Sequence, residues 1–418
     1  MRNLPETAFL ALSNISIAFA SWVLVALIAR SEGLYQVGVY GLALAVFAPI
    51  VFALAADARL RIGSGTNQSS VFEMFSLRLV LQLVALVVVV LIVSIFKVSG
   101  DVVSMMLAVF CMRAAESNFD FIYGQWVAEK QLKRVAKSQL LRSATSVVVA
   151  GVMMTIGFGA AVTLFAITLC QLALLAPSLS ACFGSMWQAE GVHFSPGKSI
   201  AKLVRTFLLE FRVSVYSALS ALNGSMPRYL LAAIGSVESV GLLTIYLQFF
   251  AAGTTLSTAV NLAYSRNVGA DVKAANKAAA GKKIGAAARG LIFSSFMIGV
   301  FMLLGCVLFA PFVLDVIFTV DRSAARLEVG LVMVAALFAY VGVSASSILL
   351  YLREVKLLVV WLVAAMVVLI TSYLCAISVG YAPLVAVSMA MIANRLFLAC
   401  MNLFGCRFYV ISNVKCTR

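Results

Sequence analysis

The sequence carries little charge, because Asp, Glu, Lys and Arg together make up only 11% of its 418 residues. A soluble globular chain carries about twice that fraction, so this composition argues against a soluble protein. Histidine occurs once, as His193, and the eight cysteines include no Cys-x-x-Cys pair. The common spacings of zinc sites are therefore missing, and we expect no disulfide, no metal and no other cofactor.

Apolar residues fill the chain instead. They account for 63% of it, and the mean hydropathy is +1.07. Apolar runs of about 20 residues, the length of a transmembrane helix, recur throughout. The sequence predicts an all-α polytopic membrane protein with about twelve transmembrane helices, the first of them a retained span rather than a signal peptide. The expected spans are 8–29, 37–57, 76–96, 102–123, 139–158, 161–182, 213–235, 238–260, 290–312, 329–350, 357–378 and 383–405.

A polar stretch in mid-chain divides these spans into six and six. We expect an N-terminal lobe at 1–190, a cytoplasmic inter-lobe linker at 191–212 and a C-terminal lobe at 213–418 with a short cytoplasmic tail. A weak repeat links the halves, since "VGVYGLALAVFAP" from Val37 matches "VGLLTIYLQFFAA" from Val240 at an offset of 203 residues. Six is an even number, so the repeat should be parallel, with its axis along the membrane normal.

The basic residues indicate the orientation. Segments expected on the cytoplasmic side hold 24 of the 31 Lys and Arg residues, and the outer segments hold four. Because Lys and Arg concentrate in cytoplasmic loops, this split predicts that both termini are cytoplasmic. It also explains the net charge of +15 through membrane lipids, without a nucleic-acid partner.

The fourth expected span contains an unusual polar stripe, in "CMRAAESNFDFIYGQ". Arg113, Glu116, Ser117, Asp120 and Gly124 fall within an arc of about 100° on a helix. Charged groups at membrane depth are costly unless they face protein or water, so the stripe could line an interior cavity. The alternative is an ion pair within the helix that only holds helices together.

Two more arginines lie within spans, Arg228 in "NGSMPRYLL" and Arg395 in "MIANRLFLACMN". Together with Arg113 they could converge on one anionic ligand, because guanidinium binds phosphate in a bidentate manner and stays charged. Asn394 is included among the candidate cavity residues. The alternative is that each arginine satisfies a local carbonyl or carboxylate.

No nucleotide-binding motif is visible, so transport against a gradient would need an ion gradient. Intramembrane carboxylates are the usual carriers of coupling ions. Glu116 and Asp120 are therefore the candidates for ion coupling.

Several stretches resemble the bacterial lipid-linked oligosaccharide flippases of the O-antigen and polysaccharide export type, within the multidrug/oligosaccharidyl-lipid/polysaccharide (MOP) exporter superfamily. They are "ALIARSEGLYQVGVYGLALAVFAP", "AAESNFDFIYGQ" with "KRVAKSQLLRS", and "NGSMPRYLLAAIGSVESVGLLTIYLQF". The resemblance implies two six-helix lobes around a central cavity, in the bacterial inner membrane. It also implies alternating access for an undecaprenyl-pyrophosphate-linked glycan, with Arg113, Arg228 and Arg395 as the matching basic residues. Glu116 beside Arg113 departs from a purely cationic cavity.

The resemblance names partners as well as an activity. The expected substrate is the lipid-linked oligosaccharide, and the polysaccharide polymerase and chain-length machinery would act next to this protein. Two other functions compete. A drug or cation antiporter of the same fold would need an acidic cavity, and a membrane polysaccharide polymerase would need a long periplasmic loop, whereas the expected outer segments are short. A transporter that is not an enzyme is the interpretation favoured by the sequence.

The basic-residue split yields a prediction on topology. Reporter fusions placed after Lys137, Lys198, Lys283 and Arg418 should all report a cytoplasmic location, because each follows a basic inner segment. A periplasmic signal from the fusion at Arg418 would contradict an even number of spans.

Overall fold

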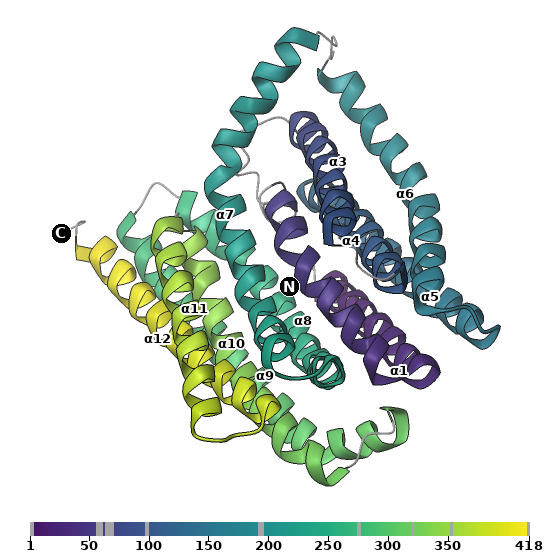
Figure 1. Cartoon of the computed structure of the whole chain (residues 1–418). Coiled ribbons are helices and arrows are strands. Elements are labelled where there is room, and N and C mark those ends of the chain that lie inside the picture. The colour runs from purple at the N-terminus through teal and green to yellow at the C-terminus, as the bar shows by residue number, and fades with distance from the viewer. Residues whose placement is uncertain are drawn as a thin grey trace. The chain divides into compact units, whose positions relative to one another are not determined.

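A computed structural model of the chain describes residues 4–55, 62, 71–96, 100–190, 196–273, 277–318, 322–351 and 354–415. Nearly all of these residues are helical (Figure 1). The helices are α1 (Leu4–Ala55), α3 (Val71–Phe96), α4 (Gly100–Ala128), α5 (Leu132–Thr155), α6 (Ala160–Glu190), α7 (Pro196–Ile234), α8 (Val237–Lys273), α9 (Lys277–Phe318), α10 (Arg322–Tyr351), α11 (Val355–Ser378) and α12 (Pro383–Lys415).

Each expected span overlaps one of these helices, and the all-helical polytopic fold is confirmed. Several helices are longer than the expected spans: α7 begins 17 residues before the expected start at 213, and α8 ends 13 residues after the expected end at 260. Within the described residues, eight helices are long and apolar enough to cross a membrane. One of these is the 42-residue stretch Leu12–Ala53 of α1, which is long enough for two crossings. In α3 the apolar segment is shorter, at Phe75–Val90.

The two crossings in α1 are separated at Gly33. Its φ of 82° and ψ of 180° interrupt the helix, in a region of backbone conformation that side chains with a Cβ avoid. The expected outer connection at 30–36 is centred on this residue. Gly33 therefore interrupts α1 within the expected connection between the first two spans.

The expected inter-lobe linker is helical in its larger part. Residues 196–212 form the first half of α7, and residues 191–195 lie outside the described residues. By packing, the chain divides into unit 1, residues 1–38 and 226–418, and unit 2, residues 39–225. These units are groups of residues in contact and do not test the expected lobe boundaries, which stay a prediction.

Unit 1 is organised around α10, which packs against α8, α9 and α12 (Figure 1). A chain of buried hydroxyl groups joins three of these helices. The hydroxyl groups of Ser257 and Ser295 lie 3.2 Å apart, those of Ser295 and Ser344 lie 2.6 Å apart, and Ser344 donates to the Asn261 side-chain oxygen at 3.0 Å. Such hydrogen bonds between helices each contribute about 1 kcal/mol in a membrane.

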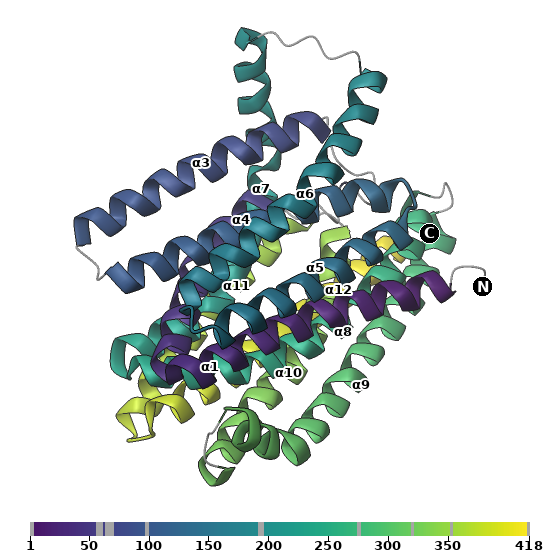
Figure 2. The same cartoon turned by 90° about the vertical axis from the view of Figure 1, so that its right-hand side faces the viewer.

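Unit 2 is built around α4. This helix packs mainly against α6, and α5 also packs against α6. The rings of Phe47 on α1 and Phe110 on α4 meet edge to face, with centroids 5.4 Å apart. Helix α3 lies beside α4 (Figure 2) and exposes Leu79, Leu83 and Val87 at helical spacing. An apolar exposed face of this kind suits contact with lipid.

The weak sequence repeat corresponds to a reciprocal contact inside unit 1. Gly38 and Gly241 are separated by 203 residues, and so are Leu34 and Val237. A Cβ added to Gly38 would overlap the Val237 carbonyl oxygen, and a Cβ added to Gly241 would overlap the Leu34 carbonyl oxygen. The same two positions of each half therefore meet where α1 crosses α8. Only glycine allows the two backbones to approach this closely.

This crossing generates a prediction on stability. Gly38→Ala and Gly241→Ala should each lower the free energy of unfolding by about 1–3 kcal/mol, the usual cost of overpacking. A loss of stability would be informative, because helix propensity alone predicts a gain: alanine is the better helix former by about 1 kcal/mol. Thermal unfolding of the purified protein in detergent measures the change.

Gly151→Ala on α5 is the matched control, because a Cβ at Gly151 meets no atom within 4 Å. It should leave stability unchanged or raise it. A Gly38→Ala protein as stable as the Gly151→Ala protein would contradict the close crossing.

Candidate functional site

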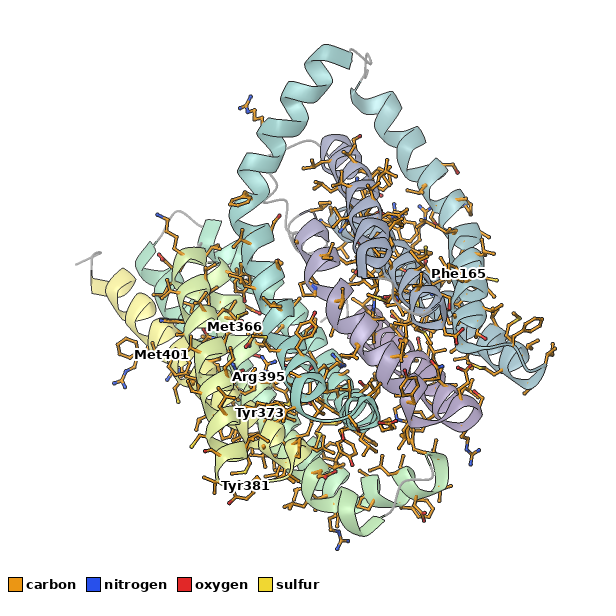
Figure 3. The ribbon with its side chains drawn as sticks, in the orientation of Figure 1. Phe165, Met366, Tyr373, Tyr381, Arg395 and Met401 are labelled. Carbon is orange, nitrogen blue, oxygen red and sulfur yellow. The ribbon has the colours of Figure 1, made fainter. Side chains whose placement is uncertain are left out.

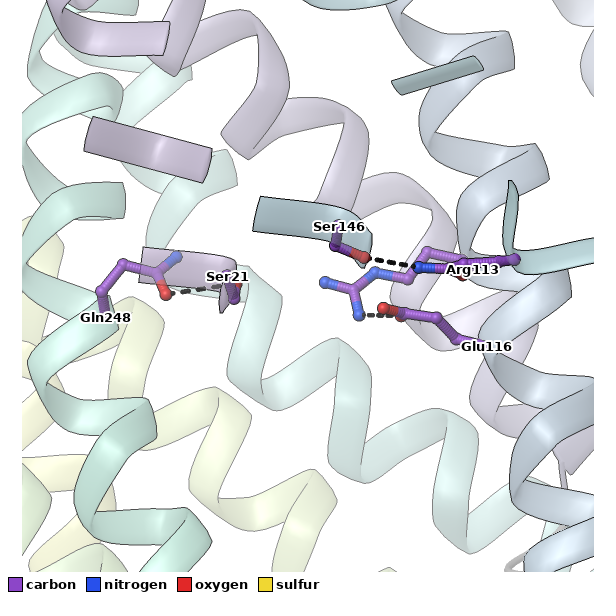
Figure 4. A network of polar contacts seen from close by, with 6 residues as sticks. Ser21, Arg113, Glu116, Ser146 and Gln248 are labelled. Atoms are coloured by element: carbon purple, nitrogen blue, oxygen red, sulfur yellow. Dashed lines mark hydrogen bonds and ion pairs between the residues drawn. The ribbon is translucent and has the colours of Figure 1, made fainter. Parts of the chain in front are cut away.

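The polar stripe on α4 begins with an ion pair. Arg113 Nη1 donates to Glu116 Oε2 at 2.6 Å, across one helical turn (Figure 4). The Arg113 side chain is 33% exposed and the Glu116 side chain 24%, so neither is sealed in the core. Asp120, one turn further on, and Tyr40 on α1 also interact electrostatically with Arg113. The guanidinium of Arg113 is therefore held by acidic groups of its own helix.

The rest of the stripe faces protein. Ser117 is 3% exposed and Gly124 is buried, and the Ser117 hydroxyl makes no hydrogen bond to any described residue. Between two other helices of unit 2, Ser146 of α5 accepts a hydrogen bond from Gln171 of α6 at 3.2 Å. Unit 2 thus contains buried polar side chains on α4 and on its neighbours, and the expected cavity along the stripe stays a prediction.

In unit 1, polar side chains of α7 and α1 contact α8. Arg228 of α7 donates through Nε to the Thr244 hydroxyl at 3.3 Å. One turn along α8, the Gln248 side chain and the Ser21 hydroxyl of α1 lie 3.4 Å apart (Figure 4). Thr244 and Gln248 share one face of the helix because they are four residues apart.

Arg395 of α12 also approaches α8 (Figure 3). Its guanidinium carbon lies 5.9 Å from the centre of the Phe250 ring. The carbonyl oxygen of the same Phe250 accepts a hydrogen bond from the Tyr340 hydroxyl at 2.8 Å, which fixes the backbone of α8 there. Within the described part of the chain, no carboxylate lies within ion-pair distance of Arg395. This half-buried arginine is therefore a positive charge available to an anion.

Asn394 points elsewhere. It is 1% exposed, and its amide nitrogen donates to the Ala365 carbonyl oxygen of α11 at 2.7 Å. Adjacent residues on a helix differ by 100° in direction, which explains why Asn394 packs against α11 while Arg395 reaches α8. Asn394 joins two helices, and its assignment to a substrate site stays a prediction.

Two buried arginines were not among the candidates from the sequence. Arg78 on α3 is 2% exposed and Arg142 on α5 is 7% exposed, although both were counted with cytoplasmic segments. Arg142 lies over the Phe119 ring, 5.3 Å from its centre. The available signal was their position, since each falls at the edge of an apolar run, where a helix can enclose it.

The predicted meeting of Arg113 with Arg228 and Arg395 joins residues of both units and stays a prediction. What each unit contains is clear. Unit 2 presents an arginine paired with a glutamate, and unit 1 presents two arginines directed at α8, one of them on a hydroxyl and one on an aromatic ring. Groups of this type can bind phosphate or carboxylate.

No protein-family model matches the chain, and no curated protein matches it by sequence. Solved structures do match. A MATE protein in complex with MaD5 is 18% identical, with a TM-score of 0.68 over 98% of this chain and 96% of that one. A multidrug resistance MATE transporter of the MOP superfamily in an outward-facing conformation is 16% identical, with a TM-score of 0.66 over 98% and 96% of the chains.

Two further matches widen the comparison. A mutant of the Vibrio cholerae MATE transporter VcmN is 13% identical, with a TM-score of 0.65 over 98% of this chain and 96% of that one. A multidrug resistance MATE transporter in an inward-facing conformation is 17% identical, with a TM-score of 0.61 over 97% and 95%. The chain therefore has, over nearly its full length, the two-lobe helical fold of MATE transporters of the MOP superfamily.

Proposed function

We propose that this protein is a flippase that moves undecaprenyl-pyrophosphate-linked O-antigen or other polysaccharide repeat units from the cytoplasmic to the periplasmic leaflet by alternating access. The fold supports a transport function, because the chain is similar to MATE transporters in outward-facing and inward-facing conformations. The substrate class rests on the resemblance to polysaccharide flippases together with the charge of the described polar groups.

Arg395 is the observation that carries the proposal. Placing a guanidinium at membrane depth costs about 3 kcal/mol even on the lower scales, and no described carboxylate compensates its charge. A site built for cationic drugs would gain nothing from such a residue, since like charges repel. A pyrophosphate group would satisfy both its charge and its hydrogen-bond donors.

Arg113 is the second phosphate-binding residue of the proposed site. In the structure Glu116 holds its guanidinium at 2.6 Å. When the pyrophosphate arrives, Arg113 exchanges Glu116 for the phosphate oxygens and joins Arg395 and Arg228 around the anion. The exchange avoids an isolated charge in either state, which would otherwise be strongly destabilising.

The alternative is a drug or cation antiporter, favoured by the multidrug resistance proteins among the structural neighbours. Glu116 and Asp120 would then bind the cation. Drug susceptibility of a deletion strain separates this function from glycan export.

We predict that Arg113→Ala and Arg395→Ala reach the membrane in normal amounts and leave the lipid-linked glycan on the inner leaflet, because each variant loses a phosphate ligand. Arg113→Lys should restore export only in part, since an ammonium group lacks the planar fork of guanidinium. Immunoblots of membranes and gels of surface glycan measure the two quantities.

Arg134→Ala is the matched control, because Arg134 is exposed and also lies over an aromatic ring, that of Trp126. It should export normally. If the Arg113–Glu116 pair only holds the helix bundle together, Arg113→Ala would instead be scarce, and the double variant Arg113→Ala with Glu116→Ala would recover abundance and export. Full export by either single arginine variant would contradict the substrate site.

Ion coupling gives a separate prediction. The double variant Glu116→Gln with Asp120→Asn cannot bind and release a proton at these positions, so its export should fall severalfold and should no longer depend on the proton gradient. Surface glycan is measured with and without an uncoupler, in parallel with the wild type. Export equal to that of the wild type under both conditions would rule out these carboxylates as carriers.

A further inference from the structure

Arg78 lies in an enclosed polar place between α3 and α4. It is 2% exposed, and its Nη1 donates to the Ser117 carbonyl oxygen at 2.8 Å. The Phe121 ring lies on one side, with its centre 5.7 Å from the guanidinium carbon. One turn along α3, the Gln82 and Asn118 amides pair at 3.4 Å. The backbone carbonyl thus fixes one end of the guanidinium.

The other edge of this guanidinium has no partner. Arg78 Nε and Nη2 are both buried and neither makes a hydrogen bond within the described structure. These two atoms matter as a pair, because their N–H bonds point the same way and form the edge that binds phosphate or carboxylate in a bidentate manner. The Ser117 hydroxyl is also buried and without a partner. Three polar atoms on facing helices are therefore unsatisfied.

The positive charge of Arg78 also lacks a close negative partner among the described residues. Among the described residues no carboxylate lies within ion-pair distance of Arg78, although Asp120 interacts with it electrostatically from further away. A buried charge without a close partner is strongly unfavourable, and an anion on the open edge would remove the penalty.

The position of Arg78 suits a lipid phosphate. It is the eighth residue of α3, about 10 Å along the helix from Val71. The predicted topology puts this end of α3 on the cytoplasmic side, near the depth of the phospholipid headgroups. The helix exposes Leu79, Leu83 and Val87, so lipid chains can lie beside it.

We propose that Arg78 and Ser117 form a phosphate-binding site between α3 and α4, with the Nε and Nη2 edge and the serine hydroxyl as its donors. Its ligand is a phosphate group, carried by a membrane lipid of the inner leaflet or free in solution. The site lies within unit 2 and includes none of the arginines of the proposed transport site, so it can exist whichever substrate is moved.

Binding to the purified full-length protein in detergent tests the proposal, with two probes at constant ionic strength. One is inorganic phosphate, and the other is dihexanoyl phosphatidic acid below its micelle concentration. At least one probe should raise the thermal unfolding temperature of the wild type in a saturable way. Arg78→Gln should weaken that binding at least ~10-fold, the loss expected for a bidentate charged contact.

Three further variants keep the result interpretable if Arg78→Gln folds poorly. Ser117→Ala preserves the backbone carbonyl and should weaken binding while the ligand-free protein stays stable. Arg78→Lys keeps the charge without the bidentate edge and should bind more weakly than the wild type. Asp120→Asn removes a nearby negative charge and should tighten binding. Arg134→Gln, an exposed arginine of the same unit, should bind like the wild type.

The two probes identify the source of the phosphate. A shift with phosphatidic acid alone assigns the site to a lipid headgroup, and a shift with inorganic phosphate assigns it to a free anion; either supports the proposal. A wild type that responds to neither probe, or a response that survives both Arg78→Gln and Ser117→Ala, would overturn it. Because the assay measures binding and not transport, a failure here leaves the proposed function untouched.

Discussion

A guanidinium within the membrane must find a partner, and this constraint organises the polar structure of the protein. Hydrocarbon offers no hydrogen bonds, so each of the arginines described above makes at least one stabilising contact inside the protein. Arg113 uses a carboxylate, and Arg78 uses a backbone carbonyl. Arg142 and Arg395 lie over aromatic rings, and Arg228 donates to a threonine hydroxyl. These partners belong to α4 in unit 2 and to α8 in unit 1.

The partners differ in how completely they satisfy the arginine. A carboxylate neutralises the charge, whereas a carbonyl, a hydroxyl or a ring only stabilises it in part. Arg395 and Arg78 therefore remain able to attract an anion, and Arg113 can do so only if Glu116 is displaced. The proposed phosphate site at Arg78 is therefore separate in its residues from the proposed transport site, which uses Arg113, Arg228 and Arg395.

The sequence predicted the helices well because lipid imposes a simple rule on them. A span needs about 20 apolar residues, and runs of that length are visible without any knowledge of packing. The interruption of α1 at Gly33 falls in an expected outer connection. The match between Val37 and Val240 was weak as a sequence signal and predicted only a parallel repeat, whereas the close crossing of Gly38 and Gly241 at the same offset became visible only in the structure. Glycines at a shared offset carry more information than the apolar residues around them.

Side-chain direction was harder to predict. Asn394 and Arg395 are neighbours in the sequence, but the helix turns them toward different partners, α11 and α8. Arg78 was assigned to a cytoplasmic segment because arginines near span ends are common there, and only the fold shows that it is enclosed against α4. Most of the expected linker is helical, since polar composition does not exclude a helix. Each difference depends on contacts between helices, which composition does not encode.

Transport in proteoliposomes measures the proposed activity most directly. The purified protein would be reconstituted with an undecaprenyl-pyrophosphate-linked glycan in one leaflet, and arrival in the other leaflet would be followed with a membrane-impermeant glycan-modifying enzyme. A neutral glycolipid with the same sugars serves as the comparison. We expect rapid movement of the pyrophosphate-linked glycan and little movement of the neutral one, because the arginines recognise the phosphates. Equal movement of both lipids, or movement of neither together with uptake of a cationic drug, would contradict a flippase that selects an anionic lipid.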